Sequence, residues 1–129
     1  MAEIKTAIIS HLNNTPAVFA AFGNRITSER VPDKQTYPYA VLWTVTAPKK
    51  YNHQGESGRT PMIQIDVFDD DAAGADANAL LIDNALSGYK GMLGSLNAGY
   101  VFVNRGPDMW NPDERNYRRI LEVAIGTND

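Results

Sequence analysis

The chain has 129 residues, of which 43% are hydrophobic and 21% charged, and twelve basic against fifteen acidic side chains give a net charge of −3. This length predicts one domain, residues 1–129, with a single core. The acidic balance argues against tight binding to phosphate backbones, no apolar run approaches the roughly 18 residues of a membrane span, and the lack of cysteine excludes disulfides and thiolate sites. We expect a soluble protein without an export signal or a membrane partner.

The N-terminal residues have the spacing of two helices. A first amphipathic helix is predicted by an apolar stripe at one helical face: Ile4, Ala7, Ile8 and Leu12. Thr15 followed by Pro16 is typical of an N-cap with proline in the first turn, so a second, short helix is expected through Phe22, with Gly23 ending it. Residues 25–28 are expected to form a short strand before a polar loop.

The next strong signal is the strand YAVLWTVTA, residues 39–47, which is rich in β-branched and aromatic side chains. Its period of two places four side chains on one face: Tyr39, Val41, Trp43 and Val45. Residues 48–61, PKKYNHQGESGRTP, are polar and contain two prolines and two glycines. They predict a long loop or an extended hairpin tip.

The stretch PMIQIDVFDDD, residues 61–71, predicts a strand that is followed by a helix start. Alternation directs Ile63, Ile65 and Val67 to one face, and places Asp66 on the other, less buried face. Residues 69–71 then precede a helical segment, where aspartates serve as cap and first-turn residues. We expect this helix to present the stripe Ala73, Ala77, Leu80, Leu81 and Ala85, and we expect Trp43, Ile65 and Leu81 to share one core cluster.

The same stretch also allows an enzymatic interpretation. A metal-dependent nuclease or hydrolase would use the carboxylates of Asp66, Asp69, Asp70 and Asp71. No D-x-D-x-D-G loop with a distal glutamate is present, however, and the positions of the three consecutive aspartates fit helix capping. We therefore predict no catalytic residue, no metal and no cofactor.

The C-terminal third is expected to contain two more strands. A glycine-rich stretch from Gly88 predicts an irregular connection, residues 100–104 a strand, residues 105–116 a polar turn region, and residues 117–125 a final strand. Short polar turns between strands favour antiparallel pairing. The fold class is therefore α+β, a two-layer domain with a mainly antiparallel sheet of about four to five strands and two main helices on one face.

Two polar regions carry the candidate contact residues. Lys49, Lys50 and Arg59 flank Tyr51 and His53, a combination that allows base stacking and phosphate contacts in a nucleic-acid-binding module, although a solvated loop tip or a protein-contact arm is favoured. Trp110 is either a core plug or an exposed contact residue. The candidate oligomer or partner interface is Lys49, Lys50, Tyr51, His53, Arg59 and Trp110.

The order of these segments resembles a known family. A helix pair ending in FGNRI is followed by YPYAVLW, RTPMIQIDVFDDD, ALLIDNALSGYKGML and a closing RRILEVAIG. This order and spacing resemble the small tail-completion or tail-terminator proteins of long-tailed bacteriophages over roughly the whole chain. Asn24 stands where the family often has aspartate.

The resemblance implies a structural role in the virion. Such a protein forms a ring, usually six-fold, at the head-proximal end of the tail, ends polymerisation of the tail tube and mediates head–tail joining. The partners it implies are further copies of the chain, the tail tube protein and the head connector or neck protein, with DNA passing through the lumen without specific binding. Assembly would take place in the bacterial host cytoplasm. Another neck or connector protein of the same architecture remains an alternative.

Overall fold

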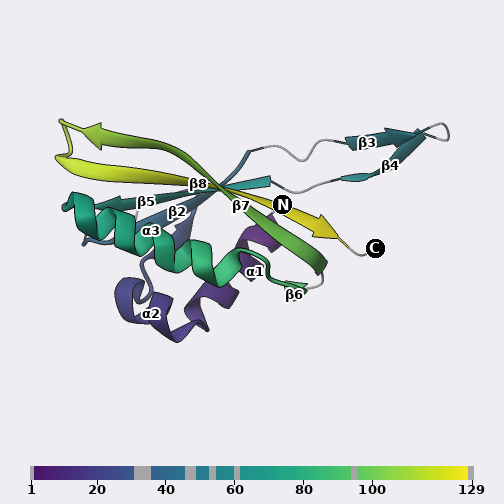
Figure 1. Ribbon diagram of the computed structural model, residues 1–129, viewed down its shortest axis with the longest axis horizontal. Helices are drawn as coiled ribbons and strands as arrows, with labels where there is room; N and C mark the ends of the chain where they lie inside the picture. The colour runs from purple at the N-terminus through teal and green to yellow at the C-terminus, as the bar shows by residue number, and fades with distance from the viewer. Residues whose placement is uncertain are drawn as a thin grey trace.

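The computed structural model of the protein describes residues 2–30, 36–45, 49–52, 55–59, 62–93 and 96–127 (Figure 1). Within these ranges lie three helices, α1 (Ala2–Asn13), α2 (Pro16–Phe22) and α3 (Ala72–Leu86). The main sheet is built from β1 (Ile26–Ser28), β2 (Tyr39–Thr44), β5 (Met62–Asp69), β6 (Gly91–Leu93), β7 (Leu96–Asn111) and β8 (Asn116–Thr127). None of the helices in these ranges is long and apolar enough to cross a membrane.

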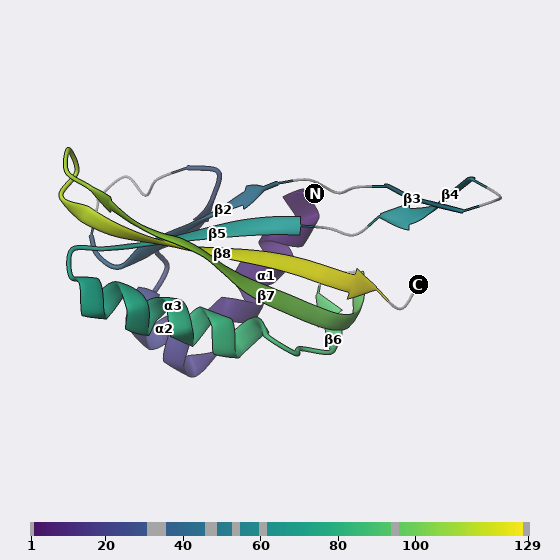
Figure 2. The same cartoon turned by 45° about the horizontal axis from the view of Figure 1, so that its top comes forward.

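The architecture is a two-layer α+β arrangement, as predicted. The helices gather on one side of the sheet and leave its other side uncovered (Figure 2). The sheet has six strands in the order β1-β2-β5-β8-β7-β6, and β1 pairs with β2 in parallel while the other pairs are antiparallel. The predicted count of four to five strands therefore missed one strand, β6, and the sheet is mainly antiparallel with one parallel pair, β1–β2.

The hydrophobic core lies between the sheet and the helices. Alternation in β5 and β8 directs one set of side chains toward the helices: Ile63, Ile65, Val67, Leu121, Val123 and Ile125. Ile8 and Leu12 of α1 and Val18 and Phe22 of α2 meet them and are fully buried. The predicted stripe of α1, the proline-led second helix and the alternation of β5 are thereby confirmed.

The phase predicted for α3 was wrong. The buried side chains of this helix are Ala75, Ala79, Ile82 and Leu86, whereas Leu80 is 50% exposed. Leu81 is only partly buried and packs against the core from its margin. Alanine occurs on both possible stripes, so burial was decided by the larger Ile82 and Leu86 packing against the sheet.

Trp43 was also assigned to the wrong face. Strand β2 is apolar on both sides, and the residues that join the core are Ala40 and Leu42. Trp43 lies on the uncovered side and is 39% exposed. A strand without polar alternation does not indicate which of its faces meets the helices.

The region predicted as a polar turn, residues 105–116, is mostly strand. Strands β7 and β8 form a long hairpin whose turn spans residues 112–115. The register shifts between Arg105 and Asp108, so that Gly106 and Pro107 fall in a bulge. A Cβ on Gly106 would lie 3.0 Å from Ile120 Cγ2, so glycine permits this close approach of the two strands. The glycine and proline, which predicted the end of a strand, are therefore accommodated in a bulge within β7.

Candidate assembly surfaces

Residues 49–59 form a two-stranded arm. Strands β3 (Lys49–Asn52) and β4 (Gly55–Arg59) pair antiparallel with one another and belong to a sheet of their own. In Figures 1 and 2 this ribbon extends away from the helices and the main sheet. The expectation of an extended hairpin tip is thus met, and the arm carries Lys49, Lys50, Tyr51 and Arg59, whereas His53 lies outside the described residues.

The second surface is the uncovered face of the main sheet. Large apolar side chains are exposed here, at Trp43 on β2, at Val45 directly after β2, and at Tyr100 and Phe102 on β7, where Phe102 is 54% exposed. The rings of Tyr100 and Phe102 contact one another at 4.5 Å between centroids. Exposed aromatic and aliphatic groups gathered on one face of a sheet are typical of a protein-contact surface.

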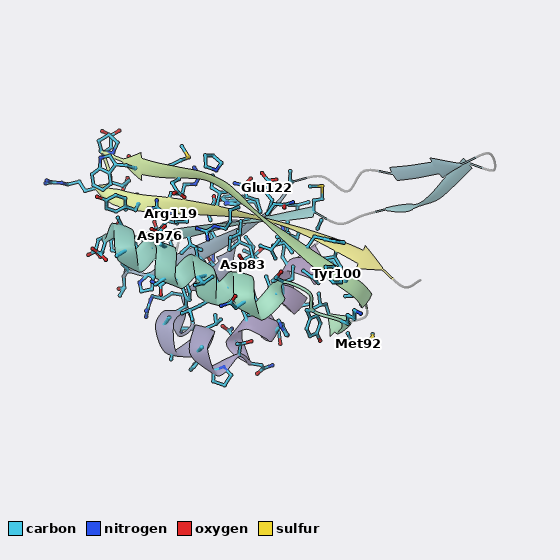
Figure 3. All side chains as sticks on the ribbon, in the orientation of Figure 1. Asp76, Asp83, Met92, Tyr100, Arg119 and Glu122 are labelled. Atoms are coloured by element: carbon cyan, nitrogen blue, oxygen red, sulfur yellow. The ribbon has the colours of Figure 1, made fainter. Side chains whose placement is uncertain are left out.

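A row of neighbouring residues crosses the same face and joins Trp43 to three polar side chains. The strand registers place Trp43 beside Gln64, Gln64 beside Glu122, and Glu122 beside Asn104. Glu122 is exposed, and it makes no ion pair or side-chain hydrogen bond with any residue in the described part of the chain. Figure 3 labels Glu122 on the strand above α3, along which Asp76 and Asp83 lie.

A buried carboxylate lies next to this row. Asp66 is on the uncovered face, as alternation predicted, but it is only 2% exposed, so the expectation of a less buried position was wrong. Its Oδ2 accepts a hydrogen bond from Arg118 Nη2 at 2.7 Å, and its Oδ1 accepts one from Gln64 Nε2 at 2.9 Å. Arg118 also lies over the ring of Phe68, at 5.9 Å from the centroid. The arginine and the aromatic residues cover Asp66 and compensate its charge.

The four aspartates of the enzymatic interpretation are divided between two faces. Asp69 lies on the helix-covered side of β5, where its Oδ2 accepts a hydrogen bond from Asn78 Nδ2 at 2.9 Å and its Oδ1 accepts one from the Asp70 amide at 2.7 Å. Burial raises the pKa of Asp69, and the neighbouring Asp70 adds to the rise. Asp71 caps α3, accepting a hydrogen bond from the Gly74 amide at 2.7 Å, as predicted. Within the described ranges, no group of three or more histidine or carboxylate side chains is gathered to hold a metal ion.

The tip of the β7–β8 hairpin presents Trp110. This side chain is 48% exposed and packs against Tyr117 at 4.6 Å between ring centroids. Trp110 was expected either to fill the core from a loop or to be an exposed contact residue, and the structure shows that it is exposed. Arg119 anchors the hairpin to α3, because its Nε donates to Asp76 Oδ1 at 2.5 Å and lies 3.4 Å from Asp108 Oδ1 (Figure 3). Arg118 and Arg119 therefore act on opposite faces of the sheet.

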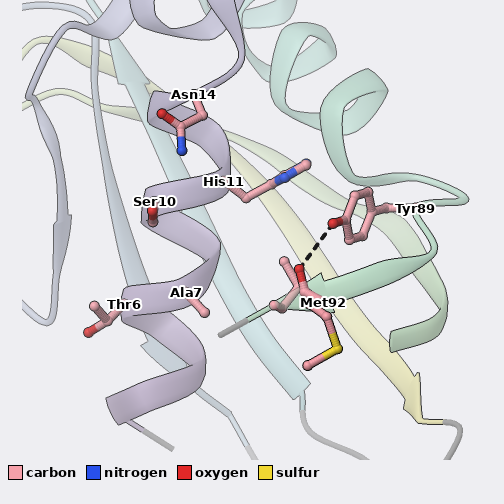
Figure 4. Close-up of a pocket in the computed structure, with 8 residues that line it drawn as sticks. Thr6, Ala7, Ser10, His11, Asn14, Tyr89 and Met92 are labelled. Atoms are coloured by element: carbon pink, nitrogen blue, oxygen red, sulfur yellow. Dashed lines mark hydrogen bonds between the residues drawn. The ribbon is translucent and has the colours of Figure 1, made fainter. Parts of the chain in front are cut away.

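A groove of about 600 Å³ lies between α1 and β6 (Figure 4). It is lined by Thr6, Ala7, Ser10, His11, Asn14, Tyr89, Met92 and Leu93. His11 Nε2 donates to the Ala85 carbonyl at 3.0 Å, and the Tyr89 hydroxyl donates to the Met92 carbonyl at 3.0 Å. No periodic pattern in the sequence indicated this groove, because β6 is a three-residue strand in a glycine-rich stretch.

Comparison with known proteins agrees with the segment order. The profile of the family described as tail completion protein gp17 matches residues 6–128. Among solved structures, a chain of the virion of a native gene transfer agent particle has a similar fold, with a TM-score of 0.76, 18% sequence identity, and coverage of 94% of this chain and 91% of that chain. No curated protein matches the sequence. The family match extends over nearly the whole chain, from α1 to the end of β8. The chain therefore belongs to the family of tail completion protein gp17, and it is a structural component of the tail or head–tail junction in a phage-like virion.

Proposed function

We propose that the protein forms a closed ring with six-fold symmetry at the head-proximal end of the tail. The ring ends polymerisation of the tail tube and provides the surface on which the head connector docks. Copies related by a heterologous rotation that closes make a ring, and such an interface needs two different surfaces on each subunit. The observation that carries the proposal is the pair of such surfaces on one chain, a projecting arm and an uncovered apolar sheet face.

The proposed role is structural and not enzymatic. Three of the four carboxylates that a hydrolytic site would need already have partners: Asp71 caps α3, Asp69 accepts from Asn78, and Asp66 accepts from Arg118. Asparagine also caps helices, so the simultaneous change of Asp69, Asp70 and Asp71 to asparagine leaves tail completion intact. Tail length and infectious titre measure this outcome. Loss of function in a normally folded triple variant contradicts the structural role.

The arm is proposed as the element that spans neighbouring subunits, and Trp110 at the hairpin tip as a contact for the tail tube or the connector. The net negative charge of the chain suits a passage through which DNA moves without specific binding. A DNA titration at low and high salt tests this point, since a nucleic-acid-binding module shows steeply salt-dependent affinity.

Shortening of the arm tests the proposal directly. Replacement of residues 49–59 by a short glycine-containing turn removes a ribbon that pairs with no strand of the main sheet. Because loop length affects closure entropy only weakly, we expect the variant to keep the circular dichroism spectrum of the wild type. Ring formation and tail capping are lost, leaving tails of uncontrolled length. Native mass spectrometry of the purified protein, alone and with tail tubes, gives the ring number, and normal capping by the shortened variant contradicts the role of the arm.

A further inference from the structure

We infer that the arm of one subunit docks on the uncovered sheet face of the next copy, with Glu122 as the acidic anchor for the basic residues of the arm. This inference rests on the proposed ring and adds the surface that receives the arm. The occupant of the sheet face is therefore a defined segment of a second copy, residues 49–59.

Charge distribution along the chain supports this pairing. Residues 49–59 contain Lys49, Lys50 and Arg59 against a single acid, Glu56, so the segment is net basic within a chain of net charge −3. The remainder of the chain is correspondingly more acidic. The register makes Lys49 and Arg59 cross-strand partners, so two basic residues stand at the same level of the ribbon and an anion is the complementary group on a receiving surface.

The uncovered sheet face supplies that anion. Glu122 is exposed, it has no partner in the described part of the chain, and Trp43, Gln64 and Asn104 lie in its register row. Two other carboxylates, those of Asp66 and Asp76, already have a basic partner within the chain, because Asp66 is paired with Arg118 and Asp76 with Arg119. A free carboxylate flanked by exposed aromatic rings matches a basic ribbon that contains a tyrosine.

The geometry of the arm leads to the same conclusion. A two-stranded ribbon alone in water is marginally stable and gains from packing against a further surface. Among the described residues, strands β3 and β4 pair only with each other, and the ribbon extends away from the main sheet (Figures 1 and 2). The groove beside α1 is a weaker receptor, because its lining contains no acidic residue.

Charge reversal tests the inference. Glu122→Lys weakens subunit association at least tenfold in sedimentation velocity, and so does the triple change Lys49→Glu, Lys50→Glu and Arg59→Glu. A chain that carries all four changes regains association. Asp83→Lys, with the same change of charge on α3, is the matched control and associates as the wild type does.

Disulfide trapping tests the location without altering charge at Glu122. The chain has no cysteine, so Asn104→Cys combined with Tyr51→Cys reports only the intended contact. Mild oxidation of the assembled double variant gives a ladder of covalent oligomers, whereas Asp83→Cys with Tyr51→Cys gives none. Rings that form without this ladder, or that are unaffected by Glu122→Lys, overturn the inference while the proposed function stands. Absence of rings from the wild type, both alone and with tail tubes, overturns both.

Discussion

The two faces of the sheet differ in how they are stabilised, although they are built from the same strands. The helix-covered face is a continuous apolar layer in which Ile63, Ile65 and Val67 are fully buried. The uncovered face combines a buried, compensated carboxylate at Asp66 with exposed aromatic groups at Trp43 and Phe102. Neighbouring residues of β5 therefore have different physical roles, since burial on one side stabilises the fold and exposure on the other leaves surface for a partner.

The largest expected effect lies on the helix-covered face. Ile65→Ala removes a fully buried side chain and leaves a cavity, so the free energy of unfolding falls by about 2–5 kcal/mol. Phe102→Ala on the uncovered face removes a larger side chain but costs less, because more than half of it is already in solvent. Urea denaturation of the two variants measures the difference. Equal losses contradict the division between a folding face and a contact face.

A smaller loss is expected when the charge of Asp66 is left uncompensated. Arg118→Met removes the charged donor at 2.7 Å and leaves Gln64 as the remaining side-chain donor, which costs about 1–3 kcal/mol. Adding Asp66→Asn recovers part of that loss, because a neutral amide no longer needs the arginine. A double-mutant cycle by chemical denaturation yields the coupling energy. Strict additivity of the two changes shows that the pair is not coupled.

Asp69 lies on the helix-covered face of β5, where burial raises the pKa of its carboxyl group. The folded state then holds a proton more tightly than the unfolded state, so the stability contributed by Asp69 falls as the pH rises from 3.8 through the raised pKa. Asp69→Asn removes this dependence. Urea midpoints of the two proteins, compared over a pH series from 3.8 upward, reveal it as a difference that grows in favour of the variant. A difference that is constant with pH contradicts the raised pKa.

The smallest effect is expected at Leu80. Half of this side chain is exposed on α3, so Leu80→Ala changes the free energy of unfolding by roughly 0.5 kcal/mol or less. Ile82→Ala, two residues away, is the matched control and behaves as a core truncation. Thermal unfolding of both variants measures the contrast. A large loss at Leu80 restores the helix phase that the sequence predicted.

Periodicity was informative where polar and apolar residues alternate. The faces of β5, the stripe of α1 and the cap at Asp71 followed from spacing alone. The phase of α3 and the orientation of Trp43 did not, because α3 contains alanine on both stripes and β2 is apolar on both sides. In such elements tertiary packing decides which side is buried, and spacing carries no information about it.

The contact surfaces were predictable only in part. Polar composition identified residues 48–61 as a projection, yet the β3–β4 pairing depends on register that composition does not encode. Glu122 was not singled out, since its place in a row with Trp43 and Gln64 arises from strands distant in sequence. The outer half of β7 was missed because Gly106 and Pro107 resemble a break, while a bulge in the structure accommodates both.

At one edge of the main sheet β1 is three residues long, and at the other β6 pairs only with Leu96–Ala98, so the rest of β7 is itself an edge. An edge strand offers unpaired amide and carbonyl groups on which another chain adds as a further strand; the shortness of β1 limits that addition, and the bulge at Gly106 and Pro107 interrupts it along β7. Growth of an unlimited fibre through the sheet edges is thereby disfavoured at high concentration. A protein whose family completes a polymer is in this way protected from becoming one.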